Sequence, residues 1–144
     1  MLKKTLFIIF LLMEIMAFGQ TENDTVHVKI EPFKFNNIPD IIDGGTCYFA
    51  SSIDDCRDGE YIFVNDFSSY GCIKINGIVQ LLELSMYNLK DEMYIYIYTG
   101  TDVVVEIQVK GILEKEDGMY SVVKFIVQTK SDSFEKTLFG RCDC

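Results

Sequence analysis

The chain has 144 residues, of which 49% are hydrophobic and 24% are charged, and its net charge is −9. This length fits one domain, and the hydrophobic content excludes an intrinsically disordered chain. The negative charge excludes nucleic acid as a partner, because phosphates require a basic surface, and it disfavours binding to anionic lipid.

Residues 1–19 have the features of a secretory signal peptide. Lys3 and Lys4 precede an apolar run over residues 5–13, and small residues that suit signal peptidase follow. The apolar run is too short to span a bilayer, and Glu14 interrupts it. We expect cleavage near Gly19–Gln20, a periplasmic or secreted mature protein, and no stable membrane insertion afterwards. The mature chain keeps 11 basic and 21 acidic residues, a net charge of −10.

We interpret residues 20–45 as a polar N-terminal lead-in, because both prolines, Pro32 and Pro39, lie there among mixed polar residues. Alternation over residues 25–30 predicts an edge strand. Residues 31–45 predict a loop or a loosely packed segment.

Residues 46–144 are expected to form a single β domain, because short β-rich runs follow one another with turn-like breaks. Asn76–Gly77 is the strongest hairpin signal, since both central residues of a type I′ turn need positive φ. Residues 114–118 supply a further polar turn. The runs that predict strands are residues 46–50, 60–65, 71–75, 78–84, 93–98, 103–113, 119–128 and 134–139.

Evidence for helices is weak. Residues 81–89 have helical spacing but also follow the hairpin directly, and one short helix or turn is expected around Ala50–Asp55, with Ser51 as its cap. No crossover helix long enough for a parallel sheet is available. The sequence therefore predicts an all-β fold, a small antiparallel barrel or sandwich of about eight strands, stabilised by disulfides.

The cysteines of the mature chain are Cys47, Cys56, Cys72, Cys142 and Cys144, and export predicts that they are oxidised. The odd number leaves at least one without an intramolecular partner. We favour a bridge from Cys142 or Cys144 to Cys47, because closing a long loop stabilises most. Cys56 with Cys72 is the second expected pair.

The terminal Cys142-Asp143-Cys144 suggests an alternative, a thiol-redox enzyme, because a disulfide across one residue is strained and therefore oxidising. The sequence lacks Cys-x-x-Cys and a βαβ pattern, so structural bridges are favoured. Metal binding is disfavoured, since oxidised cysteines cannot ligate.

Other candidate sites have simpler explanations. His27 is the only histidine, and no nucleophile elbow accompanies it. Paired carboxylates for glycoside hydrolysis are expected by chance in so acidic a chain. Residues 54–60 carry acids and a glycine as calcium loops do, but Cys56 and Arg57 break the spacing, so a solvated turn is favoured.

Tyr94, Tyr96 and Tyr98 alternate with Met93, Ile95 and Ile97, so the tyrosines share one face of a strand. Such a row, if exposed, could stack on sugar or contact a protein. Packing between neighbouring strands is the alternative, which we favour.

Several segments together resemble a group of small, uncharacterised exported bacterial β-proteins. They are CYF at residues 47–49, GEYIFVNDF at 59–67, IKING at 73–77 and FGRCDC at 139–144. The resemblance implies export and a disulfide-stabilised fold, and it carries no catalytic residues. In size, export signal, strand count and disulfide use, the chain is also similar to periplasmic lysozyme inhibitors of the C-type barrel kind, a likeness of architecture alone.

We therefore expect a non-catalytic binding protein of the cell envelope that needs no cofactor or metal. Its partner is expected to be a protein or a glycan, and its acidic surface suits a basic partner, for example a cationic cell-wall hydrolase such as lysozyme. The alternatives are a small thiol-redox envelope enzyme and a structural envelope component.

Overall fold

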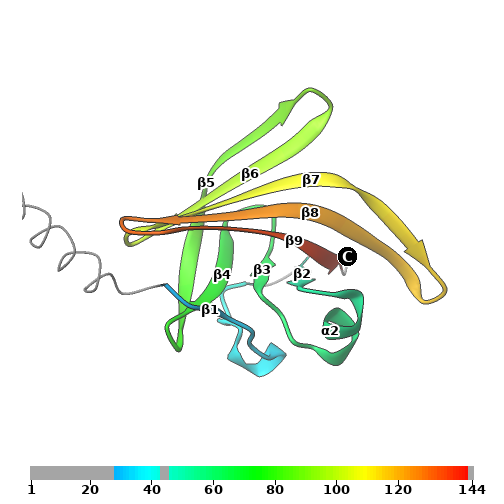
Figure 1. Cartoon of the computed structure of the whole chain (residues 1–144), viewed down its shortest axis with the longest axis horizontal. Helices are drawn as coiled ribbons and strands as arrows, with labels where there is room; N and C mark the ends of the chain where they lie inside the picture. Colours follow the sequence, from blue (N-terminus) through cyan, green and yellow to red (C-terminus); the bar gives the residue numbers. More distant parts are fainter. Residues whose placement is uncertain (1–27, 43–45, 143–144) are drawn as a thin grey trace, which may run out of the picture.

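The computed structural model describes residues 28–42 and 46–142 and shows a closed antiparallel barrel (Figure 1). The strand order is β4-β3-β2-β9-β8-β7-β6-β5, and pairing between β4 and β5 closes the ring of eight strands. The elements are β1 (Ile30–Glu31), η1 (Phe35–Asn37), β2 (Cys47–Ala50), α2 (Ile53–Asp58), β3 (Phe63–Asn65), β4 (Tyr70–Ile75), β5 (Ile78–Lys90), β6 (Met93–Gly100), β7 (Val103–Lys115), β8 (Gly118–Thr129) and β9 (Ser133–Cys142). The predicted all-β fold is confirmed, and the barrel is the form it takes.

Alternation along the strands fills the barrel with apolar side chains. The ring of Phe63 lies near the centre and packs against Tyr98, Phe125 and Phe49 at centroid distances of 5.2, 5.7 and 6.3 Å. The backbone must leave space for these rings, since a Cβ on Gly140 would lie 2.3 Å from Phe49. The other fully buried side chains of this core include Ile73, Leu82, Val105, Ile107, Val123 and Leu138.

The hairpin turn predicted at Asn76–Gly77 joins β4 to β5, with φ of 50° and 83° at its two residues. These positive values match a type I′ turn, whose twist suits the paired strands. The strand that follows is longer than the predicted residues 78–84, because β5 continues to Lys90. Residues 81–89 are therefore strand rather than helix.

Two long hairpins, β5–β6 and β7–β8, project from the barrel and diverge at their ends (Figure 1). Pairing between β6 and β7 reaches only Ile95 and Gln108. Beyond that point β6 still pairs with β5, and β7 still pairs with β8, as far as each turn. The hairpin ends therefore present surface that the barrel does not cover.

The described part of the lead-in packs against the barrel, with Val28 and Ile30 on its main core and Phe33 on its outer face. Strand β1 pairs with β4 beyond the end of β3. Phe33 forms a bridge with Tyr61 and is only 2% exposed, in a cluster with Val64 and Cys72. Residues 32–42 are largely loop, which is one of the two predicted alternatives, but they are not loosely packed, because Phe33 covers apolar side chains on the outer face of the sheet.

A short helix, α2, covers another part of the outer face. Its cap is Ser52 rather than the predicted Ser51, and the Ser52 hydroxyl accepts a hydrogen bond from the Asp55 amide at 3.0 Å. Gly59 ends the helix in the left-handed conformation with φ of 75°. The predicted solvated turn over residues 54–60 is therefore wrong, since Cys56 anchors a helix in a cluster with Ala50 and Tyr120.

Candidate binding surface

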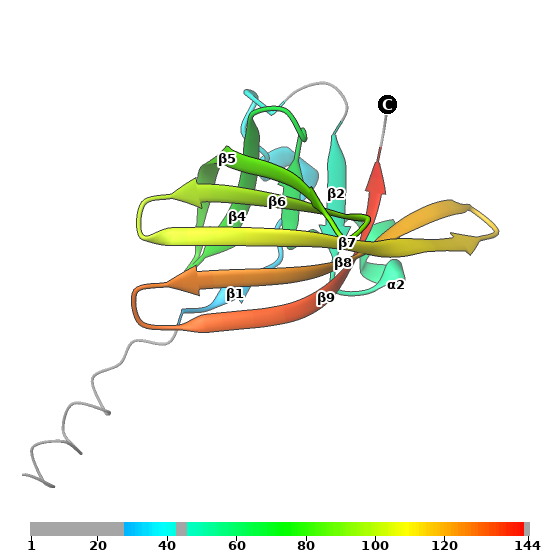
Figure 2. The same cartoon turned by 90° about the horizontal axis from the view of Figure 1, so that it is seen from above.

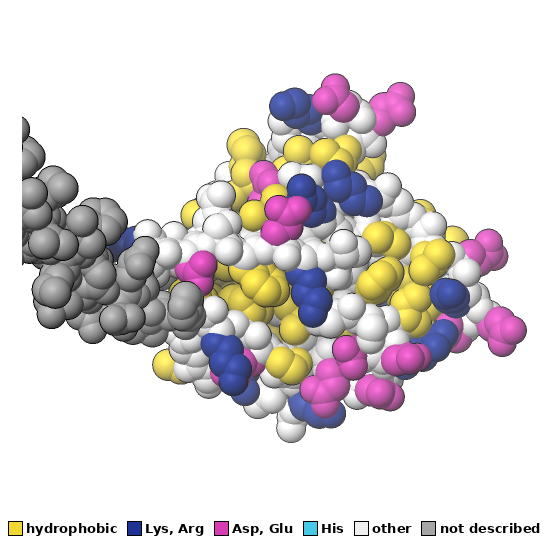
Figure 3. Space-filling model, viewed as in Figure 1, with side chains coloured by type: hydrophobic (Ala, Val, Ile, Leu, Met, Phe, Trp, Pro, Cys, Tyr) yellow, Lys and Arg dark blue, Asp and Glu magenta, His cyan; other side chains and the backbone are white. Residues whose placement is uncertain are grey.

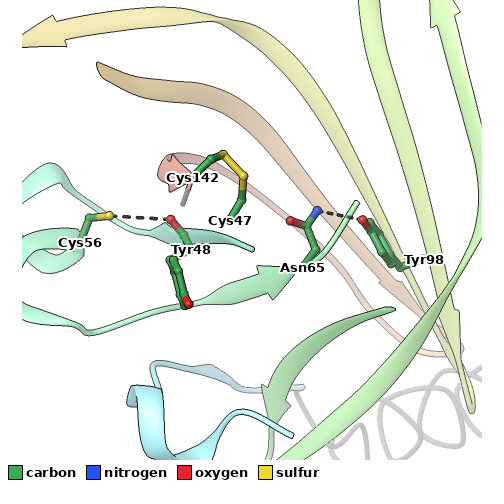
Figure 4. The surroundings of a disulfide bond; sticks show 6 residues. All are labelled: Cys47, Tyr48, Cys56, Asn65, Tyr98 and Cys142. Atoms are coloured by element: carbon green, nitrogen blue, oxygen red, sulfur yellow. Dashed lines mark hydrogen bonds between the residues drawn. A yellow bond between two sulfur atoms is a disulfide. The ribbon is translucent and has the colours of Figure 1, made fainter. Parts of the chain in front are cut away.

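The long-range disulfide joins Cys47 to Cys142, which stand directly opposite each other on β2 and β9 (Figure 4). The predicted bridge between Cys47 and a C-terminal cysteine is thus confirmed, and Cys142 is the partner of Cys47. The bond uses the Cys142 thiol, so the Cys142–Cys144 bridge of the redox hypothesis is not formed. Cys144 lies outside the described residues.

The predicted Cys56–Cys72 bridge is wrong, because both thiols are free and lie in different clusters. Cys56 lies on α2, and its thiol donates to the carbonyl oxygen of Tyr48 at 3.7 Å (Figure 4). Cys72 is fully buried on β4, beside Val64. Burial raises the pKa of both thiols, that of Cys72 to about 12. Both cysteines therefore behave as small apolar side chains.

The three tyrosines of the row differ in burial according to their position along β6. Tyr98 is fully buried, and its hydroxyl accepts a hydrogen bond from Asn65 Nδ2 at 2.8 Å (Figure 4). Burial raises the pKa of Tyr98 above its usual range. Tyr98 is thus part of the core, and its prediction as a binding residue is wrong. Tyr96 is partly buried, whereas Tyr94 is 44% exposed.

Tyr94 and Tyr96 belong to a larger group of side chains on the β5–β6 hairpin. Tyr87 lies opposite Tyr96, with ring centroids 5.0 Å apart, and its ring stacks on Tyr94 at 6.0 Å. Phe67, from the loop between β3 and β4, contacts Tyr96 at 4.8 Å. Leu89 lies opposite Tyr94. We name Phe67, Tyr87, Leu89, Tyr94 and Tyr96 the hairpin cluster.

The hairpin cluster is unusually exposed for apolar side chains so close together. Tyr87 is 54% exposed and Leu89 is 55% exposed. Hydrophobic side chains are visible near the end of the β5–β6 hairpin, below charged side chains at its tip (Figure 3). An exposed group of this kind is a feature of interaction sites, because scattered single residues are the usual pattern on a monomer.

The sequence interpretation missed three members of the hairpin cluster, for two different reasons. Tyr87 and Leu89 follow the predicted end of the strand, and simple alternation past Leu84 would place them on the opposite face. A β-bulge between Leu84 and Met86 shifts the alternation by one residue and brings them beside the tyrosine row. Phe67 adopts a φ of 59° in a loop. No sequence pattern predicts that its ring meets Tyr96.

A polar cluster ties the end of the β7–β8 hairpin to α2. The Asp117 carboxylate accepts hydrogen bonds from Arg57 Nε at 2.9 Å, Arg57 Nη2 at 3.0 Å and the Tyr120 hydroxyl at 2.5 Å. Arg141 also lies 3.7 Å from this carboxylate. Arg57 and Arg141 each lie 5.9 Å from the Tyr120 ring, a cation–π distance. The cluster therefore holds the end of the β7–β8 hairpin against α2.

The hydrogen bonds from Arg57 hold the pKa of Asp117 below its usual range. A carboxylate with a lowered folded pKa contributes stability above its unfolded pKa of about 3.9, and that stability is lost as the pH falls through the folded value. We expect Asp117→Asn to be less stable than the native protein at pH 6, with the difference shrinking below about pH 3.9. Thermal unfolding of both proteins at pH 6 and at several pH values below about 3.9 measures this difference.

Asp54→Asn is the matched control for Asp117→Asn. Its carboxylate is 86% exposed and contacts only one nitrogen of the same arginine, Arg57 Nη1, at 3.2 Å. An exposed pair of this kind contributes little. A stability difference for Asp117→Asn that stays constant across the pH range would contradict the role of the ionised carboxylate.

The structure gives no further support to the other predicted sites. His27 lies outside the described residues. The acids of residues 54–60 lie on or beside α2, and no group of three His, Cys, Asp or Glu side chains among residues 28–42 and 46–142 could hold a metal. Within the same ranges, no helix is long and apolar enough to cross a membrane.

Comparison with known proteins gave no match to a protein-family model, a curated protein or a solved structure.

Proposed function

We propose that this chain is an exported, non-catalytic binding protein of the cell envelope that binds a basic partner protein through the hairpin cluster. The observation that carries the proposal is the exposed group of tyrosine rings on a projecting hairpin. Tyrosines are enriched at protein interfaces, because they bury a large area and lose little conformational entropy. The rings contact one another, so the surface is already ordered before a partner arrives.

The filled interior of the barrel supports a function at the outer surface. Phe49, Phe63 and Phe125 lie in the interior and are at most 1% exposed. A barrel that holds a small ligand needs an interior cavity, whereas here aromatic rings occupy the centre.

Charge supports a basic partner. The whole chain has a net charge of −9, and Asp91 and Glu92 form the turn at the tip of the β5–β6 hairpin. Opposite charge accelerates encounter and selects among partners. A cationic cell-wall hydrolase such as lysozyme has the required charge, and inhibition or sequestration of such an enzyme is the activity that we propose.

The signal-peptide features of residues 1–19 support export. The Cys47–Cys142 disulfide is compatible with an oxidising compartment.

The test is a calorimetric titration with lysozyme, together with a lysozyme activity assay. We expect the native protein to bind and to inhibit. Replacing Tyr87 and Tyr94 with Ala is expected to weaken binding by about tenfold or more, since truncating an aromatic anchor costs about 2 kcal/mol or more. Binding is expected to weaken with added salt, as charge attraction does but ring stacking on a glycan does not.

The matched control replaces Ile112 and Met119 with Ala. These side chains are 68% and 65% exposed on the other projecting hairpin, so the change removes comparable apolar surface elsewhere. The control variant should bind as the native protein does. Absence of binding at a large excess of protein, or equal loss in both variants, would show that the proposal is wrong.

A further inference from the structure

The outer face of β6, β7 and β8 carries several apolar side chains, where an antiparallel sheet usually presents polar ones to water. Ile97 from β6, Val104 from β7 and Ile126 from β8 alternate with buried residues of the barrel interior and therefore point outward. Val104 is 38% exposed. Figure 2 shows these strands side by side, with no described element lying over them. This face thus offers a second surface that is separate from the hairpin cluster.

A groove of about 170 Å³ lies on this face, and it contains one carboxylate. Glu106 stands directly opposite Ile97 on one side and Ile126 on the other, so an isoleucine flanks it on each neighbouring strand. Val104 and Gln128, which are also paired, complete the lining. The groove therefore has apolar walls and one acidic group.

The charge of Glu106 is not neutralised within the described residues. Its carboxylate accepts a hydrogen bond from Gln108 Nε2 at 2.8 Å, and no described Lys or Arg nitrogen lies within 4.0 Å of it. Lys124 lies opposite Gln108 on β8, but its ammonium pairs with Glu135 at 2.9 Å. A cation that entered the groove would complement this unpaired carboxylate.

We infer that this groove is a second binding site, which takes the side chain of a lysine or arginine from a basic partner protein. Lys and Arg combine an apolar stem with a cationic head, so the stem fits Ile97 and Ile126 while the head pairs with the carboxylate of Glu106. A second copy of this chain fits the groove poorly, because association would bring together two chains that each carry a charge of −9.

The site is tested with small probes by NMR of the ¹⁵N-labelled protein. The probes are Nα-acetyl-lysine methylamide and its neutral analogue Nα-acetyl-norleucine methylamide, which has a similar stem without the ammonium. We expect the lysine probe to produce saturable shifts at the amides of Ile97, Glu106 and Ile126. The norleucine probe should produce much smaller shifts at the same concentration.

Glu106→Gln keeps the shape of the side chain and removes its charge. We expect the lysine probe to bind this variant about two- to fivefold more weakly, within the range for a partly exposed charge pair. Glu135→Gln is the matched control, because Glu135 lies beside Ile126 on the same outer face but already pairs with Lys124. Its affinity for the probe should be unchanged, and the thermal unfolding of Glu106→Gln should match that of the native protein.

Equal shifts from the two probes, or unchanged affinity in Glu106→Gln, would overturn the inference. Sedimentation that shows a dimer formed through this face would also overturn it, because a second copy would then occupy the groove. The inference adds a site to the proposed function without depending on the hairpin cluster. The variant with Ala at Tyr87 and Tyr94 should keep its affinity for the lysine probe, so the two proposals fail separately.

Discussion

Replacing both Cys47 and Cys142 with Ala is expected to lower the free energy of unfolding by about 3–4 kcal/mol. The bridge spans 95 residues, and a cross-link over so long a loop restricts the unfolded chain strongly. It also fastens a short pairing, since β2 is only four residues long and is the strand through which β9 joins β3. Denaturant unfolding of the native and variant proteins measures the loss.

The control for the disulfide experiment is Cys144→Ala. Because Cys142 forms the bridge, this variant should unfold at the same denaturant concentration as the native protein. Equal destabilisation by Cys144→Ala and by the double variant would mean that the bridge uses Cys144 instead.

Phe63→Ala is expected to cost about 3–5 kcal/mol, the range for removing a large buried ring. Phe63 is fully buried and contacts three other rings, so its loss leaves a cavity at the centre of the barrel. The backbone at Gly71 fits closely around the ring, since a Cβ there would lie 2.6 Å from it. Chemical unfolding followed by circular dichroism measures the change.

Phe35→Ala is the control for the core substitution, because Phe35 is 66% exposed. Its effect should stay within about 0.5 kcal/mol, as for most surface changes. Phe63→Leu provides a milder core variant that remains measurable if Phe63→Ala does not fold. Equal costs at Phe63 and Phe35 would contradict the central position of the Phe63 ring.

Local patterns in the sequence predicted most of the strands. Alternation placed Met93–Tyr98 correctly, and the asparagine–glycine pair located the β4–β5 turn. Closure of the barrel was not predictable, because, besides the local β4–β5 hairpin, it requires pairing between β2 and β9, which lie far apart in the chain. The incorrect pairing of Cys56 with Cys72 has a similar cause. The fold buries the two cysteines in different clusters, and a sequence pattern does not show which cluster each residue joins.

The candidate surfaces could be predicted only in part. The tyrosine row was visible in the sequence, but whether each ring is buried depends on how far along β6 the barrel extends. Tyr98 lies in the core, and Tyr94 lies beyond it. The Glu106 groove was harder to predict from the sequence, because Ile97, Glu106 and Ile126 become neighbours only through the register of three strands.

Amide hydrogen exchange with and without lysozyme tests most directly whether the projecting hairpin is the binding surface. We predict that saturating lysozyme slows exchange over residues 86–96, which contain most of the hairpin cluster, and that Ala at Tyr87 and Tyr94 removes this protection. Exchange over residues 112–119 of the other hairpin should not change. Unchanged exchange over residues 86–96, or protection confined to other strands, would contradict the proposed binding surface.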